Sequence, residues 1–152
     1  MELRKIASFQ VDHDVLQRGI YTSRIDGDVT TYDIRMKLPN KGVYLNNPAM
    51  HTIEHLIATF VRSSDYSDRI IYFGPMGCRT GFYLLVRDIA PNEVIALIKD
   101  AFGFLAEYEG EIPGVSSIEC GNYLEHDLAD AVKEAKEYLP VIENYTVEQL
   151  KY

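Results

Sequence analysis

The segment Asn47-Pro48-Ala49-Met50-His51-Thr52-Ile53-Glu54-His55-Leu56-Ile57 places the strongest constraint on the fold. Asn47 is a favourable helix cap, and Pro48 fits the first turn of a helix. Apolar residues then recur at helical spacing, which predicts an amphipathic helix with one core-facing stripe. That stripe comprises Met50, Ile53, Leu56, Ile57, Phe60 and Val61.

Two histidines on this predicted helix lie on the side away from the apolar stripe. His51 and His55 are four residues apart, so their imidazoles stand one above the other on a single helix face. A second element or a second subunit must therefore cover them. Glu54 points about 60° away from His51 on the helical wheel, which suits proton transfer better than metal binding.

A downstream cysteine, Cys120, could complete a metal site with His51 and His55. Two histidines and one thiolate leave a fourth position open, which is typical of catalytic rather than structural sites. The alternative is that the histidines are solvated or hydrogen-bonded and that Cys120 is an inert buried thiol. The Glu between the histidines favours the metal site, because H-x-x-E-H is a metalloenzyme pattern.

The segments around this helix predict an α+β domain with an antiparallel sheet. Asp26-Gly27 is a hairpin-turn signal, with Tyr32, Ile34, Met36 and Leu38 alternating behind it. We expect a hairpin at 20–38, strands at 69–73 and 81–86, helices at 91–108 and 124–139, and a loop at 110–121. Pro140 is expected to end the last helix, and residues 1–152 form a single domain.

Composition narrows the function further. The 152 residues include 47% apolar and 25% charged residues, which is ordinary for a soluble domain. A formal net charge of −8 argues against nucleic acid as a partner. No secretory signal or apolar run long enough for a membrane span is present, so we expect a cytoplasmic protein. The two cysteines are therefore expected to be free thiols.

A glycine-rich turn carries the other cysteine, in Gly74-Pro75-Met76-Gly77-Cys78-Arg79-Thr80-Gly81. The glycines would let the backbone approach a ligand closely, and Arg79 could favour a thiolate; the alternative is a structural turn with an incidental cysteine. Arg35, on the hairpin face opposite Tyr32 and Ile34, is by composition a solvated arginine. Ser8, Asp12, His13 and His126 individually suggest caps or surface positions, with His126 near a helix start.

Together these segments resemble the S-ribosylhomocysteine lyase family, the enzymes that make the autoinducer-2 precursor of bacterial quorum sensing. The resemblance covers nearly the whole chain. It rests on residues 8–13, 32–35, 39–41, 51–56, 74–83 and 119–121, whose order and spacing agree. The H-T-x-E-H-L and P-M-G-C-x-T-G motifs are its most specific parts.

The resemblance implies a two-layer α+β fold with a four-stranded antiparallel sheet, in a homodimer with two sites at the interface. It implies that His51, His55 and Cys120 hold Fe(II), with Zn(II) or Co(II) as substitutes. Cys78 and Glu54 would then be the paired acid/base groups. Ser8, His13 and Arg35 match positions that help to hold the substrate, some of them across the dimer.

The implied reaction is a carbon–sulfur cleavage in homocysteine metabolism and the activated methyl cycle. S-ribosylhomocysteine would give homocysteine and 4,5-dihydroxy-2,3-pentanedione. The carbonyl must first move from C1 to C3 of the ribose, because the thioether leaves only from a position β to a carbonyl. Each move removes a proton beside a carbonyl.

One departure from the family pattern concerns substrate binding. The family commonly reads Asp-Ile-Ser where this chain reads Tyr72-Phe73-Gly74. The missing carboxylate would be expected to meet the homocysteine ammonium group. Two other functions remain open: a metallohydrolase of the H-x-x-E-H type, which usually takes a downstream carboxylate ligand, and a non-enzymatic metal-binding descendant of the lyase.

Overall fold

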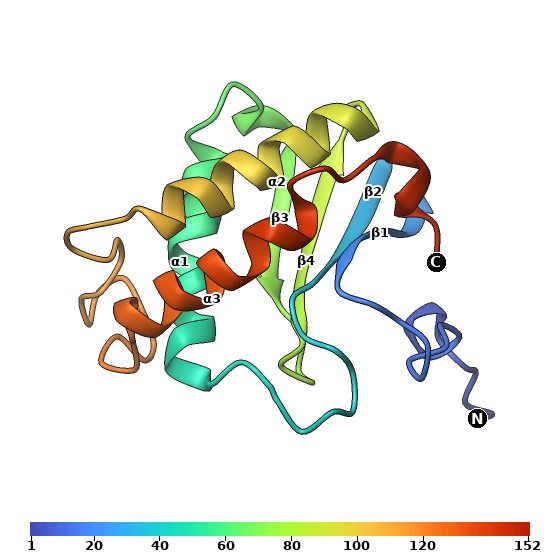
Figure 1. The fold of residues 1–152 in the computed structure, drawn as a ribbon, viewed down its shortest axis with the longest axis horizontal. Coiled ribbons are helices and arrows are strands. Elements are labelled where there is room, and N and C mark those ends of the chain that lie inside the picture. The colour runs from blue at the N-terminus through green and yellow to red at the C-terminus, as the bar shows by residue number, and fades with distance from the viewer.

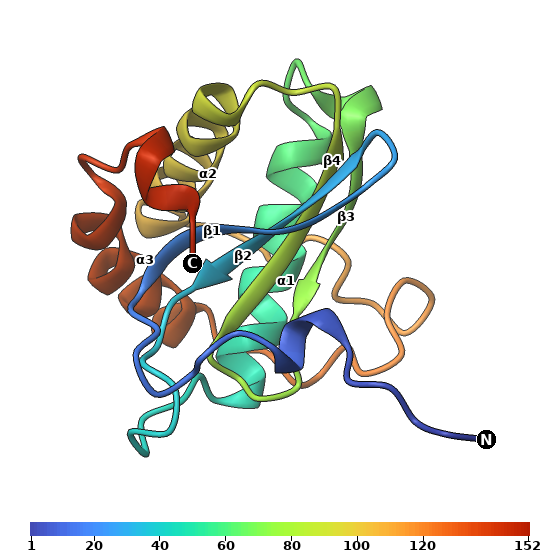
Figure 2. The same ribbon diagram turned by 90° about the vertical axis from the view of Figure 1, so that its right-hand side faces the viewer.

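A four-stranded antiparallel sheet with three helices on one face forms the body of the protein (Figures 1 and 2). The computed structural model describes residues 1–152. The sheet has the order β1-β2-β4-β3. Its strands are β1 (Gly19–Asp26), β2 (Val29–Arg35), β3 (Ile70–Pro75) and β4 (Gly81–Arg87). The helices are α1 (Asn47–Arg62), α2 (Pro91–Ala106) and α3 (Leu128–Ile142), and the predicted α+β class is confirmed.

The predicted hairpin forms, with a shorter second strand than expected. Gly27 turns the chain with φ of 61°, a conformation that glycine adopts without strain. Tyr32 and Ile34 face the helices and are buried, as the alternation predicts. The strand ends at Arg35, because the N–H groups of the next two residues both bond to the Thr80 carbonyl. Leu38 therefore lies outside the sheet and is exposed.

Helix α1 begins where the sequence predicts, but its cap is Asn46 rather than Asn47. The Asn46 side chain accepts the N–H of Ala49 at 2.8 Å, and Pro48 occupies the first turn. The apolar stripe packs inward: Ile53, Leu56 and Ile57 are at most 2% exposed.

The predicted bounds of α3, 124–139, were wrong at both ends. The Asp127 side chain caps the helix by accepting the N–H of Asp130 at 3.0 Å, so the helix begins at Leu128. Pro140 lies inside the last turn, where its missing N–H costs the helix one hydrogen bond. Ile142, beyond it, is fully buried, and this packing holds the turn in place.

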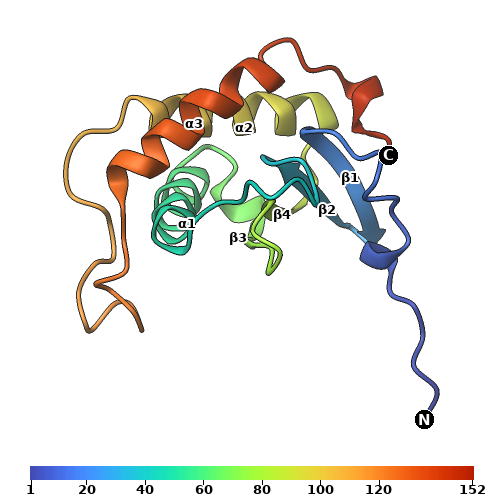
Figure 3. The ribbon, with the colours of Figure 1, turned by 60° about the horizontal axis from the view of Figure 1, so that its bottom comes forward.

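The helices and the sheet enclose one apolar core, and two segments extend beyond it on the same side. Helix α1 packs against β3, α2 and α3, and α3 also reaches β1. Figure 3 shows the loop between α2 and α3 and the N-terminal segment both hanging below the sheet and α1. No helix is long and apolar enough to cross a membrane.

Candidate metal centre and active site

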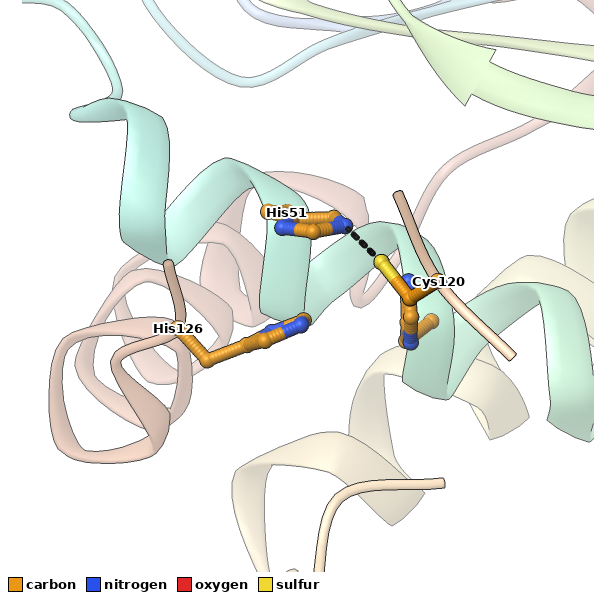
Figure 4. Close-up of side chains that lie close together, drawn as sticks. His51, Cys120 and His126 are labelled. Carbon is orange, nitrogen blue, oxygen red and sulfur yellow. Dashed lines mark hydrogen bonds between the residues drawn. The ribbon is translucent and has the colours of Figure 1, made fainter. Parts of the chain in front are cut away.

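Four potential metal-donor side chains converge beside α1. The ligand atoms of His51, His55, Cys120 and His126 all lie within 4.8 Å of one another. His51 and His55 come from α1, whereas Cys120 and His126 come from the loop before α3. In Figure 4 the Cys120 sulfur points at the His51 ring, and its Sγ lies 3.4 Å from Nε2 of His51.

Backbone carbonyls fix the orientation of both α1 histidines. Nδ1 of His51 lies 2.9 Å from the Glu125 carbonyl, and Nδ1 of His55 lies 2.7 Å from the Pro113 carbonyl. A carbonyl can only accept, so each Nδ1 carries the proton and donates it. In the neutral ring this arrangement leaves the lone pair on Nε2, which is the tautomer that binds a metal through Nε2.

The sequence predicts that a second element or a second subunit covers the two histidines. In the structure, the α2–α3 loop of the same chain covers them. Gly114, with φ of 75°, lies so close to the imidazole of His55 that a Cβ there would be 3.2 Å from Nδ1. The Cys120 N–H bonds to the Ser116 carbonyl at 3.0 Å, which fixes the local turn. Both cysteines are free, as expected.

His126 is the member of the cluster that sequence analysis missed. Its ring stacks on that of His51 with centroids 4.0 Å apart, and its Nε2 is buried without a hydrogen-bond partner. Burial lowers the pKa of His126 to about 4, helped by the neighbouring His51 and His55. The Nε2 lone pairs of His51 and His55 and the sulfur of Cys120 suit a divalent metal of the nitrogen- and sulfur-binding kind.

Glu54 lies on α1 beside the cluster without belonging to it. Its side chain is partly exposed and forms no hydrogen bond or ion pair within the chain. Its carboxylate is therefore free to exchange protons with a ligand rather than to stabilise the fold.

A cavity of about 360 Å³ brings together most of the other predicted site residues. It lies against the sheet face opposite the helices, between the N-terminal segment and the β3–β4 turn. Its lining includes four of the candidates: Ser8, His13, Arg35 and Cys78.

Arg35 is buried rather than solvated, which corrects the expectation from composition. It is 3% exposed, and its Nε and Nη2 donate to both carboxylate oxygens of Asp33, at 3.1 and 2.6 Å. Burial alone would lower the pKa of Arg35, but the Asp33 carboxylate outweighs burial and raises it. Asp33 also accepts a hydrogen bond from the Tyr152 hydroxyl at 2.6 Å.

Thr80 connects this ion pair to the cavity thiol. Its Oγ1 accepts from Nη1 of Arg35 at 2.7 Å and lies 3.1 Å from Sγ of Cys78. Because Oγ1 accepts from the guanidinium, its own proton is available to the sulfur. Arg79, expected beside the thiol, instead places its guanidinium 5.7 Å from the Tyr44 ring centre.

Within one chain, the donor cluster and the cavity share no residue. The cluster lies on α1 and the α2–α3 loop, whereas the cavity lies over β2, β4 and the N-terminal segment. Apolar side chains are exposed on both the loop and the N-terminal segment, among them Phe9, Ile118 and Leu124.

Tyr72, the departure from the resembled pattern, lies on the edge strand β3 and is 50% exposed. Its ring covers Gly74 so closely that a Cβ there would be 2.1 Å from the Tyr72 hydroxyl. The departures at positions 72 and 74 are thus coupled, because any side chain at position 74 would displace the ring of Tyr72.

These features define an α+β protein with clustered histidines and a cysteine that can hold a divalent metal, and with a separate thiol-lined cavity. The sequence model of the S-ribosylhomocysteinase (LuxS) family matches residues 6–148. The chain belongs to this family.

Curated relatives match this chain over nearly its full length. The S-ribosylhomocysteine lyase of Clostridium acetobutylicum is 45% identical, with 99% of each chain covered. The S-ribosylhomocysteine lyase of Phocaeicola vulgatus is 48% identical over 99% of this chain and 98% of its own. That of Porphyromonas gingivalis is also 48% identical, with 99% of both chains covered.

Proposed function

We propose that the protein is an S-ribosylhomocysteine lyase, which cleaves the carbon–sulfur bond of its substrate to give homocysteine and 4,5-dihydroxy-2,3-pentanedione. The observation that carries this proposal is the full-length match to relatives named for this activity. The donor cluster and the thiol cavity supply the two kinds of group that the chemistry needs.

His51, His55 and Cys120 are the proposed metal ligands, because they present two Nε2 lone pairs and a sulfur to one point. We expect Fe(II) natively, with Zn(II) or Co(II) as substitutes. A divalent ion held there would act as a Lewis acid on a sugar carbonyl. The remaining open position distinguishes such a site from a structural one.

Cys78 and Glu54 are the proposed acid/base pair. The carbonyl moves along the ribose by removal of a proton from carbon and its return to the neighbouring carbon, with matching proton exchange on oxygen. The Cys78 sulfur lies within hydrogen-bond distance of the Thr80 hydroxyl, which in turn accepts a hydrogen bond from Arg35. Glu54, with no competing partner, returns protons to oxygen.

After the carbonyl reaches C3, removal of a proton from C4 lets the C5–S bond break. The electron pair of that bond leaves with sulfur, which takes up a proton as homocysteine is released. Ser8, His13 and Arg35 border the cavity beside Cys78 and are proposed to hold the substrate there.

The single domain of residues 1–152 is proposed to act as a homodimer. One chain keeps the donor cluster and the thiol cavity apart, so a second copy could bring them together. The exposed apolar residues of the loop and of the N-terminal segment, Phe9, Ile118 and Leu124 among them, are suited to such a contact.

The metallohydrolase alternative is disfavoured by the donor set. Such enzymes usually add a carboxylate ligand, whereas this cluster contains no Asp or Glu and includes a cysteine instead. The non-enzymatic alternative shares the metal site, so only an activity measurement separates it from the lyase.

The decisive experiment is anaerobic purification, metal analysis and a thiol-release assay with S-ribosylhomocysteine. We expect one divalent ion per chain and release of homocysteine thiol. Bound metal without thiol release would favour the non-enzymatic descendant. Activity that persists in a Cys78→Ala variant would favour a water-attack hydrolase, which has no use for that thiol.

A further inference from the structure

His126 contributes a buried nitrogen that the three proposed metal ligands leave without a role. Its Nε2 is the buried side-chain polar atom of the chain that lacks a hydrogen-bond partner. In Figure 4 its ring lies beneath that of His51 and extends toward the space beside Cys120. A buried polar group without a partner destabilises the fold, so its retention calls for an explanation.

The simplest explanation, that His126 is a fourth ligand, conflicts with the ring geometry. An imidazole lone pair lies in the plane of its ring. The rings of His51 and His126 are stacked with an interplanar angle of 22°, so their planes do not meet at a common ion beside them. His51 and His55, at 90°, have no such conflict.

The hydrogen bonds of Thr52 indicate which nitrogen of His126 carries its proton. Oγ1 of Thr52 accepts the N–H of Asp127 at 3.0 Å and lies 2.9 Å from Nδ1 of His126. Nδ1 is the only hydrogen-bond acceptor within reach of the Thr52 hydroxyl, whose other partner is the Asp127 N–H donor. The hydroxyl therefore donates to Nδ1, which leaves the proton of the neutral ring on Nε2. This tautomer is the reverse of that of His51 and His55.

We infer that His126 donates a hydrogen bond from Nε2 to an oxygen atom of the bound sugar, with Thr52 as the positioning residue that fixes its tautomer. The inference rests on the proposed lyase function. A ring nitrogen of His126 lies within 4.8 Å of the ligand atoms of His51, His55 and Cys120. A preoriented donor at that place favours negative charge as it develops on the sugar oxygen.

The test uses the Co(II)-loaded full-length protein, with acetate as a small oxygen-donor probe followed by the visible spectrum. We expect His126→Ala to bind one Co(II) with the thiolate-to-cobalt band of the parent protein. Its dissociation constant for acetate should rise about tenfold, as expected for the loss of one hydrogen bond to an anion. His126→Gln, which keeps an N–H donor, should recover most of the affinity.

Thr52→Val and Thr52→Ser form the matched pair for the positioning role. The valine variant should weaken acetate binding, while the serine variant, which keeps the hydroxyl, should resemble the parent. Loss of Co(II) or a changed thiolate band in His126→Ala would overturn the inference in favour of a fourth ligand. Unchanged acetate affinity in that variant would also overturn it.

Thiol release by the parent protein is measured in parallel. Absence of thiol release would overturn the lyase proposal. The cobalt spectra and the acetate affinities test the role of His126 independently of that result.

Discussion

At the scale of single residues, the pair formed by Arg35 and Asp33 governs one side of the cavity. Both side chains are buried on the sheet face opposite the helices, and two hydrogen bonds join them. Nη1 of Arg35 donates to Thr80, which contacts the thiol of Cys78. The pair thus places the guanidinium beside the thiol at the expense of desolvating two charges.

Asp33→Asn removes the charge from this pair while it preserves the shape of the side chain. The buried guanidinium then lacks its counter-ion, so we expect the free energy of unfolding to fall by about 3–5 kcal/mol. Urea denaturation measures the change. Asp26→Asn is the matched control, because the Asp26–Arg24 pair is exposed and should contribute little. Equal effects in the two variants would contradict the structural role assigned to Asp33.

Glu54→Gln tests the proposed proton carrier without disturbing the metal donors. Since Glu54 has no partner in the chain, the variant should fold and retain metal. Its turnover should fall by about 10²–10⁴-fold, as is typical for loss of a general acid/base. Metal analysis and thiol release measure the two quantities. His51→Ala, by contrast, should lose metal, and near-normal turnover of Glu54→Gln would remove that residue from the mechanism.

The sequence could predict part of the donor cluster and not the rest, for a physical reason. His51 and His55 are recognisable because helical periodicity fixes their relative direction before any tertiary contact is known. His126 follows Cys120 in irregular structure, where spacing carries no direction, so only the folded loop brings its ring against His51. The chain has only four histidines, and the position of His126 soon after Cys120 was the one signal that could have indicated a third histidine in the cluster.

At the scale of elements, local signals located the strands and helices, and tertiary packing moved their ends. The Asp26-Gly27 turn and the apolar stripe of α1 act within a few residues and were predicted. The start of α3 depends on the Asp127 cap, and its end depends on the burial of Ile142, which local propensity does not reveal. The burial of Arg35 likewise needs the fold, since Asp33 lies on the same strand but Thr80 comes from the distant β3–β4 turn.

Edge strand β3 carries the Tyr72 departure, and Tyr72→Asp tests its effect. A carboxylate on this exposed strand would restore the group expected to meet the substrate ammonium. We expect the KM for S-ribosylhomocysteine to fall by about tenfold, as for one charge-assisted hydrogen bond. Steady-state thiol release measures it, with Tyr72→Asn as the uncharged control. A KM that is unchanged or higher would mean that the ammonium group binds elsewhere.

At the scale of the whole molecule, a buried tyrosine and a half-buried one join the C-terminal region to the sheet. The hydroxyl groups of Tyr138 and Tyr145 donate to the carbonyls of Gly19 and Ile20, both at 2.6 Å. Burial raises the pKa of Tyr145 to about 12, and it also raises the pKa of Tyr138 well above its usual value. Both phenols thus keep their protons longer in the folded state than in the unfolded state.

This linkage predicts a loss of stability at alkaline pH. The two tyrosines contribute fully to the free energy of unfolding below pH 10, which is near the pKa of an unfolded tyrosine. The contribution of Tyr145 is lost as the pH rises toward its folded pKa of about 12. The urea midpoint should therefore fall steadily across this window. Tyr145→Phe should lower stability at neutral pH and make the alkaline fall shallower. An equally steep fall in that variant would assign the alkaline loss to other groups.

The last prediction concerns which copy supplies each half of the proposed active site. If the cluster of one chain meets the Cys78 cavity of its partner, a mixed dimer of His51→Ala and Cys78→Ala chains contains one intact site and one doubly damaged site. If both halves come from the same chain, every site in that dimer lacks a group.

Each variant alone should be inactive. Random re-pairing of equal amounts should restore about a quarter of the parent activity, because about half of the dimers are mixed and each mixed dimer has one intact site of two. Thiol release before and after re-pairing measures the gain, with a His51→Ala and Cys120→Ala mixture as the control that cannot complement, since both substitutions damage the same half. Activity that stays at background after verified subunit exchange would place the whole site within one chain.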